Sequence, residues 1–171
     1  HAVVVKRTIP GENVLVADGA GQAIRGRVVV AERNRMAVEV TEILGVLPRA
    51  HCFVVAQALA KGDRSELAVE IMTEVGVDEI LAWQASRSIV RWQGERGAKS
   101  LSRWAATARE ATKQSRRFRI PEVSFANTNQ VAERIGAAEL ALVLHESAEK
   151  PLARMNLPEA GEILLIVGPE G

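Results

Sequence analysis

Apolar residues in the first part of the chain come in short runs that are rich in Val and Ile. The runs cover residues 3–5, 13–16, 24–31 and 36–44, and Gly, Asp and Asn residues typical of turns separate them. Short β-branched runs between turn residues predict strands. Several strands at this spacing predict a small β-barrel, which we expect to end within residues 43–48.

From His51 onward, apolar runs alternate with segments of helical spacing. Residues 53–59 form a continuous apolar run, which is typical of a strand buried on both faces of a sheet. Strands that alternate with helices predict a parallel sheet in an α/β domain. The further strands are expected at 77–83, 123–125, 140–145 and 163–167, and the helices between the cap Asp63 and the stop Gly76, at about 98–114 and at 127–135.

The same spacing predicts which residues face the core. On the first helix these are Leu67, Ala68, Ile71, Met72 and Val75. On the long helix they are Leu101, Trp104, Ala105, Ala108 and Ala111. Cys52 stands in an apolar run, and we expect it to fill the core as well.

Several classes of function are disfavoured by what the sequence lacks. A single cysteine allows no intrachain disulfide, which fits a reducing cytoplasm. No apolar stretch approaches the roughly 20 residues that span a bilayer, so no membrane partner is expected. Phosphate-binding P-loops and dinucleotide-binding glycine motifs are missing. His1, His51 and His145 have no Cys or Glu at ligand spacing, so we expect no metal site.

Positive charge is concentrated in one segment. Residues 87–119 contain ten Lys and Arg but only two acidic residues, Glu95 and Glu110, for a net charge of +8. The whole chain carries +1, so the remainder carries −7. A solvated helix face is the ordinary explanation for a charge run, but such faces usually mix both signs. The asymmetry favours a polyanion such as nucleic acid as the partner.

Three short polar segments each lie at the end of a predicted strand or directly after it. They are Gly168-Pro169-Glu170-Gly171, Leu144-His145-Glu146 and Lys61-Gly62-Asp63-Arg64. Ligands of open parallel sheets bind beyond the carboxyl ends of strands, and cations at a helix N-terminus favour an anion. Each segment also has an ordinary explanation: a strand-to-helix turn, a solvated strand end, and a helix capped by Asp63. Their convergence on one edge of the sheet predicts a ligand site.

These residues, in this order and spacing, resemble the RsmE family. Its members are bacterial methyltransferases that modify N3 of a uridine in 16S ribosomal RNA, and they belong to the SPOUT superfamily. The resemblance covers nearly the whole chain, but Ala60 stands where the family usually has Pro, and Arg116 where it often has Gly. Besides the three polar segments, the matching landmarks are Gln57-Ala58-Leu59-Ala60, Glu74-Val75-Gly76-Val77, Arg87-Ser88, Arg103-Trp104, Glu110-Ala111, Gln114-Ser115, Arg117 and Pro121.

The resemblance implies an α/β protein of two domains. Residues 1–47 would be an N-terminally truncated, RNA-binding PUA-like β-barrel. Residues 48–171 would be a SPOUT-type parallel-sheet domain with a trefoil knot, C-terminally truncated so that the part closing the knot is absent. It also implies S-adenosylmethionine as cofactor, 16S ribosomal RNA or the small ribosomal subunit as partner, a homodimer, and a cytoplasmic location.

The resemblance further assigns roles to residues. Arg64 and Arg117 are the catalytic candidates, because a guanidinium at a uracil carbonyl oxygen favours the anion that forms when N3 loses its proton. Glu170 is an alternative proton acceptor. Cofactor contacts fall to Leu144, His145, Glu146, Gly168, Pro169, Glu170 and Gly171. RNA contacts fall to Lys6, Arg7, Arg25, Lys61, Arg87, Arg91, Arg103, Arg109 and Lys113.

Two other readings of the sequence stay open. A non-catalytic RNA-binding or ribosome-assembly module would use the barrel and the basic segment equally well, but it gives no reason for a glycine loop after a buried strand. A SPOUT methyltransferase with a different RNA target would share the fold and the cofactor.

Overall fold

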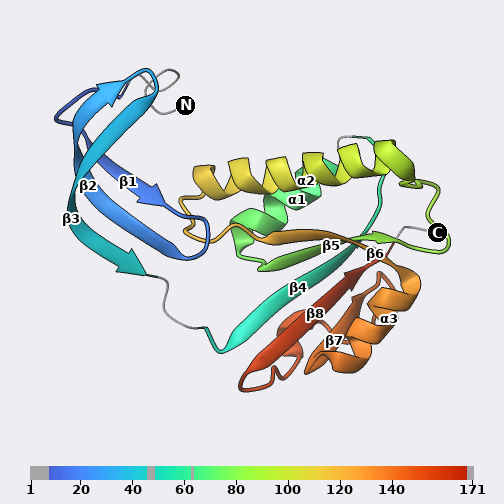
Figure 1. Ribbon diagram of the computed structural model, residues 1–171. Coiled ribbons are helices and arrows are strands. Elements are labelled where there is room, and N and C mark those ends of the chain that lie inside the picture. Colours follow the sequence, from blue (N-terminus) through green and yellow to red (C-terminus); the bar gives the residue numbers. More distant parts are fainter. Residues whose placement is uncertain (1–7, 46–48, 63, 169–171) are drawn as a thin grey trace. The chain divides into compact units, whose positions relative to one another are not determined.

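The chain folds into two compact units, residues 1–47 and 48–171. A computed structural model describes residues 8–45, 49–62 and 64–168. The first unit holds a three-stranded antiparallel sheet and the second a five-stranded sheet flanked by helices (Figure 1). The predicted α/β class is therefore confirmed at this level. None of the helices in the described ranges is long and apolar enough to cross a membrane.

The first unit consists of β1 (Asn13–Ala17), β2 (Gln22–Glu32) and β3 (Arg35–Gly45), paired in that order. The turn between β1 and β2 is fixed by the Asp18 carboxylate, which accepts hydrogen bonds from three successive backbone N–H groups at 2.7–3.0 Å. These bonds lower the pKa of Asp18. Three of the four predicted strands are confirmed, and the run at 3–5 lies outside the described residues. Closure of the sheet into a barrel stays a prediction.

All strands of the second sheet run parallel, in the order β6-β5-β4-β8-β7. A parallel arrangement brings the carboxyl ends of the strands to one edge of the sheet, which we call the carboxyl edge, and their starts to the amino edge. The strands are β4 (His51–Ala58), β5 (Glu79–Gln84), β6 (Glu122–Asn127), β7 (Leu140–Leu144) and β8 (Gly161–Val167).

Helices cover both faces of this sheet. Helices α1 (Arg64–Val75) and α2 (Gly94–Gln114) pack on one face, and α3 (Thr128–Ala137) packs on the other (Figure 1). A one-turn 3-10 helix, η1 (Leu152–Arg154), lies in the connection between β7 and β8. Strand residues alternate between the faces: Val55 and Ile80 belong to the α1/α2 core, whereas Val54 and Leu81 belong to the α3 core. Both cores are mainly aliphatic, and Trp104 is the largest fully buried side chain.

The predicted core face of α1 is confirmed for Met72 and Ala68, which belong to the α1/α2 core, and wrong for the other three residues. Leu67, Ile71 and Val75 are 55%, 50% and 76% exposed, whereas Val69 and Thr73 are fully buried. Apolar residues lie on more than one side of α1, so spacing alone does not choose the core side. A buried Thr73 is acceptable because its hydroxyl donates to the Val69 carbonyl at 2.7 Å. An apolar stripe of three large side chains is thus left on the surface of α1.

Two smaller predictions about the core are also wrong. Ala105 is exposed on α2, although Trp104 and Ala108 beside it are buried. Cys52 is exposed too, because it lies at the start of β4, before the part of the strand that the helices cover. Partial desolvation still raises the pKa of the Cys52 thiol, and Asp78 adds to the effect.

An arginine ties α3 to the sheet beneath it. The Arg134 guanidinium donates to Glu162 and Glu79 at 2.6 Å each, and these hydrogen bonds raise its pKa further. Replacing Arg134 with Met is expected to lower the free energy of unfolding by about 2 kcal/mol, because two carboxylates lose their charged partner. Urea unfolding followed by circular dichroism measures this. Arg154→Met, an exposed arginine on η1, is the control, and equal losses in both variants would contradict the expectation.

Candidate cofactor and RNA site

The carboxyl edge gathers the segments that the sequence singled out. Val167 of β8 pairs with Gln57 of β4 on one side and with Leu144 of β7 on the other, so these three strands end level. The turn at 59–62, the turn after Leu144 and Gly168 therefore emerge next to each other. The structure brings the described parts of all three polar segments together at this edge. Asp63, Pro169, Glu170 and Gly171 lie outside the described residues.

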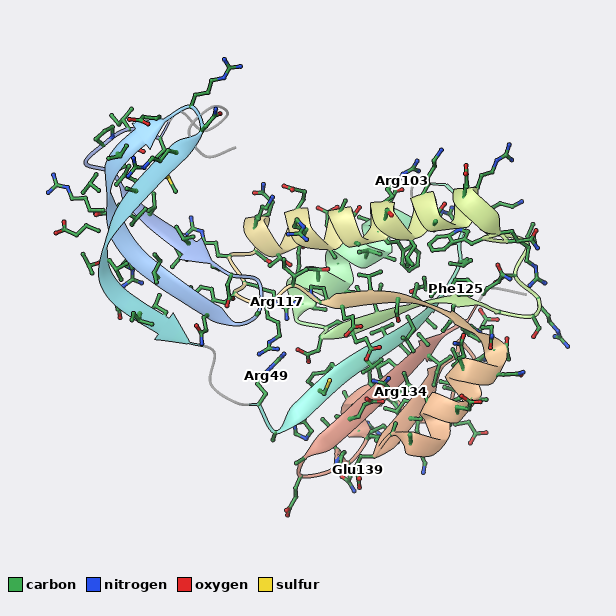
Figure 2. All side chains as sticks on the ribbon, in the orientation of Figure 1. Arg49, Arg103, Arg117, Phe125, Arg134 and Glu139 are labelled. Carbon is green, nitrogen blue, oxygen red and sulfur yellow. The ribbon has the colours of Figure 1, made fainter. Side chains whose placement is uncertain are left out.

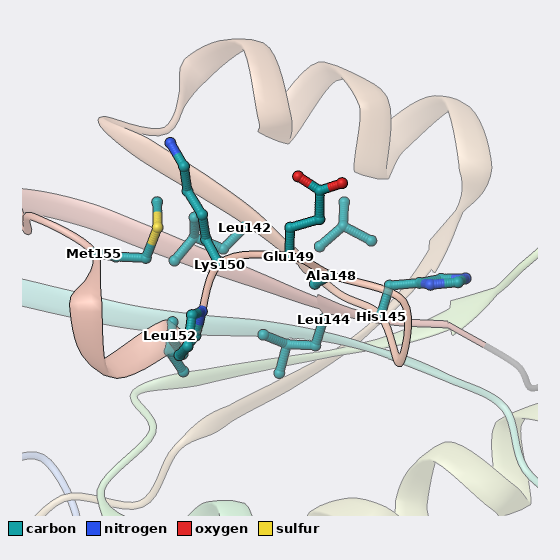
Figure 3. A pocket seen from close by; sticks show the side chains of 10 residues that line it. Leu142, Leu144, His145, Ala148, Glu149, Lys150, Leu152 and Met155 are labelled. Carbon is teal, nitrogen blue, oxygen red and sulfur yellow. The ribbon is translucent and has the colours of Figure 1, made fainter.

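A pocket of about 610 Å³ lies beside β7 at this edge (Figure 3). Strand β7 and the segment 148–155 form its walls, and its apolar lining includes Leu144, Leu152 and Met155. Glu149 and Lys150 also line the pocket, and Figure 3 shows their charged ends on the same side of it. A cavity of this size, mostly apolar with a few polar groups, is typical of a small-molecule or cofactor site.

His145 is held at the end of β7 by its own turn. Its Nδ1 accepts a hydrogen bond from the Ser147 N–H at 3.1 Å and lies 2.7 Å from the Ser147 hydroxyl. This contact leaves the ring proton on Nε2, which is then available to a ligand as a donor. His145 and Leu144 line the pocket. The neighbouring Glu146 is exposed in the same turn and does not line it.

Several basic side chains lie along the part of the carboxyl edge where β4 and β5 end. Lys61 lies in the turn after β4, and Arg64 is the first residue of α1, where the helix dipole already favours an anion. Arg87 and Arg91 follow β5, and Arg91 donates to the Ser86 carbonyl at 2.7 Å. Since all four are exposed, they present positive charge to an approaching polyanion.

Arg103 of α2 lines a hollow together with Lys61. The remaining basic candidates lie further along α2, in the other unit or outside the described residues. Arg109 and Lys113 are on the later turns of α2, toward the amino edge, and Lys113 pairs with Glu110 at 2.6 Å. Arg25 is on β2 in the first unit, where it pairs with Glu42 at 2.5 Å. Lys6 and Arg7 lie outside the described residues.

Arg117 lies at the amino edge (Figure 2), opposite Arg64 and the cofactor candidates. Its guanidinium donates to the carbonyls of Thr73 and Val77, at 2.5 and 3.1 Å, where α1 ends and β5 approaches. Burial lowers the pKa of Arg117, against the opposing effect of Asp78. The 21 residues of α2 span about 30 Å, so the end of the basic segment is carried away from its start. Within this chain Arg117 does not meet Arg64 or the cofactor candidates.

Two residues of the 85–93 segment escaped the sequence reasoning as site candidates. Trp92 projects between α1 and α2, and its backbone N–H donates to the Gln84 side chain at 2.7 Å. Ser88 is 4% exposed, and its hydroxyl has no hydrogen-bond partner in the described part of the chain. Ser88 belongs only to the Arg87-Ser88 landmark of the sequence. Neither position lies in a sequence pattern that predicts a buried hydroxyl or an aromatic surface for ligand stacking.

Replacing Ser88 with Ala is expected to leave the free energy of unfolding unchanged or to raise it by up to about 1 kcal/mol, because an unpaired buried hydroxyl costs free energy. Ser65→Ala is the matched control. The Ser65 hydroxyl donates to the Ala60 carbonyl at 2.8 Å, so its loss is expected to cost about 1 kcal/mol. Denaturant titration of both variants measures this, and a clear loss for Ser88→Ala would contradict the assignment.

The described residues hold no group of three or more His, Cys, Asp or Glu side chains arranged to bind a metal ion. The site instead offers hydrogen-bond donors, exposed Lys and Arg side chains and an apolar pocket. This set suits binding of an organic cofactor and of a phosphate backbone.

Comparison with known proteins identifies the family. The profile of a family described as RNA methyltransferase domain matches residues 49–171. The ribosomal RNA small subunit methyltransferase E of Mycobacterium tuberculosis is 42% identical over 176 residues, covering 100% of this chain and 67% of the relative. Ribosomal RNA small subunit methyltransferase E from Neisseria gonorrhoeae, solved bound to S-adenosylmethionine, is 27% identical with a TM-score of 0.82, and the match covers 98% of this chain and 69% of that one.

A Legionella pneumophila protein solved with bound S-adenosylmethionine has the same TM-score of 0.82 at 26% identity, covering 99% of this chain and 70% of that one. The profile extends over most of the second unit, and the mycobacterial match extends over both units. The chain therefore belongs to the RNA methyltransferase family that includes the ribosomal RNA small subunit methyltransferases E.

Proposed function

We propose that this protein transfers a methyl group from S-adenosylmethionine to N3 of a uridine in 16S ribosomal RNA. The observation that carries the proposal is the meeting of three strand ends, a pocket and exposed cations at the carboxyl edge of one parallel sheet. Family membership supports the reaction class. The choice of N3 and of a uridine rests on the resemblance to the RsmE family.

The residues at the carboxyl edge suit S-adenosylmethionine. Its adenine ring and the aliphatic chain of its methionine part need apolar walls and backbone groups. The amino and carboxylate groups of its methionine part need charged partners. Leu144, Leu152 and Met155 supply apolar walls, and Glu149 and Lys150 supply charge. We assign cofactor contacts to residues 144–146 and 168–171. When bound, the cofactor supplies a methyl group already activated on a sulfonium sulfur.

The chain's own contribution is then alignment and charge placement. Uracil N3 is a weak nucleophile until it loses its proton, and we take the Glu170 carboxylate as the acceptor of that proton. The resulting anion is shared with the two neighbouring carbonyl oxygens. We assign Arg64, exposed at the positive end of α1, to hold one of those oxygens by a charge-assisted hydrogen bond. Lys61 and Arg87 would hold the RNA backbone from the adjoining turns.

Further features of the proposal concern the whole protein. We infer that residues 1–47 belong to an RNA-binding PUA-like barrel and residues 48–171 to a SPOUT domain with a trefoil knot. We also infer a cytoplasmic homodimer acting on 16S ribosomal RNA or the small ribosomal subunit. The exposed stripe of Leu67, Ile71 and Val75 supports an association of this kind, because large apolar side chains on one helix face favour a partner surface.

Two measurements test the proposed function. Calorimetry on the full-length protein is expected to show binding of S-adenosylmethionine. Mass spectrometry of 16S ribosomal RNA from a strain that lacks the gene is expected to show loss of one N3-methyluridine, which the wild-type gene restores. Absent cofactor binding would instead favour a non-catalytic RNA-binding module. Cofactor binding together with an unchanged 16S methylation pattern would favour a different RNA target.

A further inference from the structure

Two hollows on the α1/α2 side of the sheet have one lining residue in common, Trp92. The polar hollow, about 290 Å³, lies between the turn after β4, the start of α1 and α2, and its lining includes Lys61, Ser100 and Arg103. The apolar hollow, about 160 Å³, lies between the start of α2 and β6. We call the two together the Trp92 groove. It shares no lining residue with the pocket beside β7.

Trp92 is held firmly in place. Its backbone N–H donates to the Gln84 side chain at 2.7 Å, and its ring meets the buried Trp104 edge-on, with centroids 5.2 Å apart at 82°. Gly97 lets the start of α2 come close to the backbone of Trp92, because a Cβ at position 97 would lie 2.9 Å from the Trp92 carbonyl carbon. An aromatic platform fixed before binding loses little conformational entropy when a ligand stacks on it.

The apolar hollow suits a nucleobase. Two aromatic residues, Trp92 and Phe125, line it, and Phe125 is 37% exposed on the edge strand β6 (Figure 2). Gly94, Ala98 and Leu101 complete the lining with small or aliphatic groups. Bases of single-stranded nucleic acid stack on such aromatic side chains with little dependence on sequence.

The polar hollow suits a phosphate. Arg103 is 71% exposed, and its ion pair with Glu66 is long, 3.3 Å, so the guanidinium is free to exchange this weak partner for a stronger one. Lys61 and the Ser100 hydroxyl complete a set of donors. The segment that carries Trp92 is strongly cationic: residues 87–103 hold Arg87, Arg91, Arg96, Lys99 and Arg103 against one acidic residue, Glu95.

We propose that the Trp92 groove binds one unpaired nucleotide of the RNA substrate, other than the methylated uridine. Its base stacks between Trp92 and Phe125, and its phosphate meets Lys61 and Arg103. The inference rests on the proposed function, because it takes RNA as the substrate. A base must leave its helix to enter a hollow, so the site selects single-stranded RNA over a duplex.

The test uses the full-length protein and two fluorescein-labelled RNA probes, a 12-nucleotide single strand of mixed sequence and the same strand paired in a duplex. Fluorescence anisotropy gives the affinities. Trp92→Leu and Phe125→Leu are each expected to weaken single-strand binding by about tenfold, with less than twofold change for the duplex. Arg103→Gln is expected to reduce the salt dependence by about one phosphate contact.

Matched controls lie outside the groove. Trp83→Leu removes an indole on the α3 side, where it donates to Thr128, and Arg154→Gln removes an exposed cation on η1. Both are expected to leave single-strand affinity within twofold. Trp92→Phe keeps a stacking ring and is expected to recover most of the affinity. If Trp92→Leu fails to fold, Phe125→Leu, on the exposed edge strand, decides the question.

Unchanged single-strand affinity in both aromatic variants would overturn the inference, and so would equal losses for single strand and duplex. The proposed function is tested separately, by calorimetry with the cofactor and by methylation of 16S ribosomal RNA with the wild-type protein. If the wild-type protein methylates 16S ribosomal RNA but RNA binding is the same with and without the Trp92 and Phe125 side chains, only the groove is refuted. If the wild-type protein does not methylate 16S ribosomal RNA but RNA binding depends on these side chains, only the proposed function is refuted.

Discussion

Replacing Arg64 with Ala is expected to lower kcat by about 100-fold, because the developing uracil anion loses the donor that holds it. The affinity for S-adenosylmethionine is expected to change by less than about threefold, since Arg64 lies at the start of α1 and not in the pocket beside β7. Single-turnover methylation of ribosomal RNA measures the first effect, and calorimetry measures the second.

Two further arginine variants sharpen this test. Arg64→Lys keeps the charge but loses the planar fork, so an intermediate kcat is expected. Arg117→Ala separates two roles for the second candidate. Its contacts with Thr73 and Val77 predict a lower melting temperature, whereas a lower kcat at an unchanged melting temperature would support the catalytic role first assigned to it. An Arg64→Ala enzyme with wild-type kcat would contradict our mechanism.

Trp104→Ala is expected to produce the largest loss of stability among single substitutions. Trp104 is 2% exposed and joins α2 to the α1/α2 core. Removing a buried indole leaves a cavity, which typically costs about 3–5 kcal/mol. For a chain of this size such a loss lowers the melting temperature by roughly 10 °C. Thermal unfolding followed by circular dichroism measures it.

Trp83→Ala is the matched control for that loss. Trp83 is partly exposed, and its Nε1 donates to the Thr128 hydroxyl at 3.3 Å, so a smaller effect is expected. Trp104→Phe, which keeps an aromatic ring in the core, is expected to lose less than Trp104→Ala. Equal destabilisation by Trp104→Ala and Trp83→Ala would show that the core does not depend on Trp104 as described.

The strands and their parallel arrangement could be predicted from the sequence, because a strand buried on both faces leaves a continuous apolar run. Residues 53–59 and 163–167 are such runs, and β4 and β8 are neighbours at the centre of the sheet. The meeting of the polar segments at one edge followed from the same rule. A loop after a parallel strand has only one edge of the sheet on which to lie.

The side of a helix that faces the core could not be predicted where several sides are apolar. Leu67 and Ile71 form as regular a stripe as Val69 and Thr73, and tertiary packing chose the second pair. The position of Arg117 could not be predicted for a different reason. The resemblance grouped it with Arg64 as a catalytic candidate, but the length of α2 carries it to the amino edge of this chain.

Trp92 shows the remaining limit of the sequence. Its neighbours in the groove come from the turn after β4, from α2 and from β6, which lie far apart along the chain. Only the order of strands in the sheet brings Lys61 and Phe125 to two hollows that Trp92 lines in common. A local pattern around Trp92 cannot reveal such a site.

Hydrogen–deuterium exchange on the full-length protein, with and without S-adenosylmethionine, tests the central claim most directly. We expect protection of backbone amides in residues 144–147 and in the segment that begins at Gly168, where β7 and β8 end. Amides of residues 73–78 and 115–117, at the amino edge, are expected to exchange unchanged. Protection confined to the amino edge, or to the sheet of the first unit, would contradict the placement of the cofactor at the carboxyl edge.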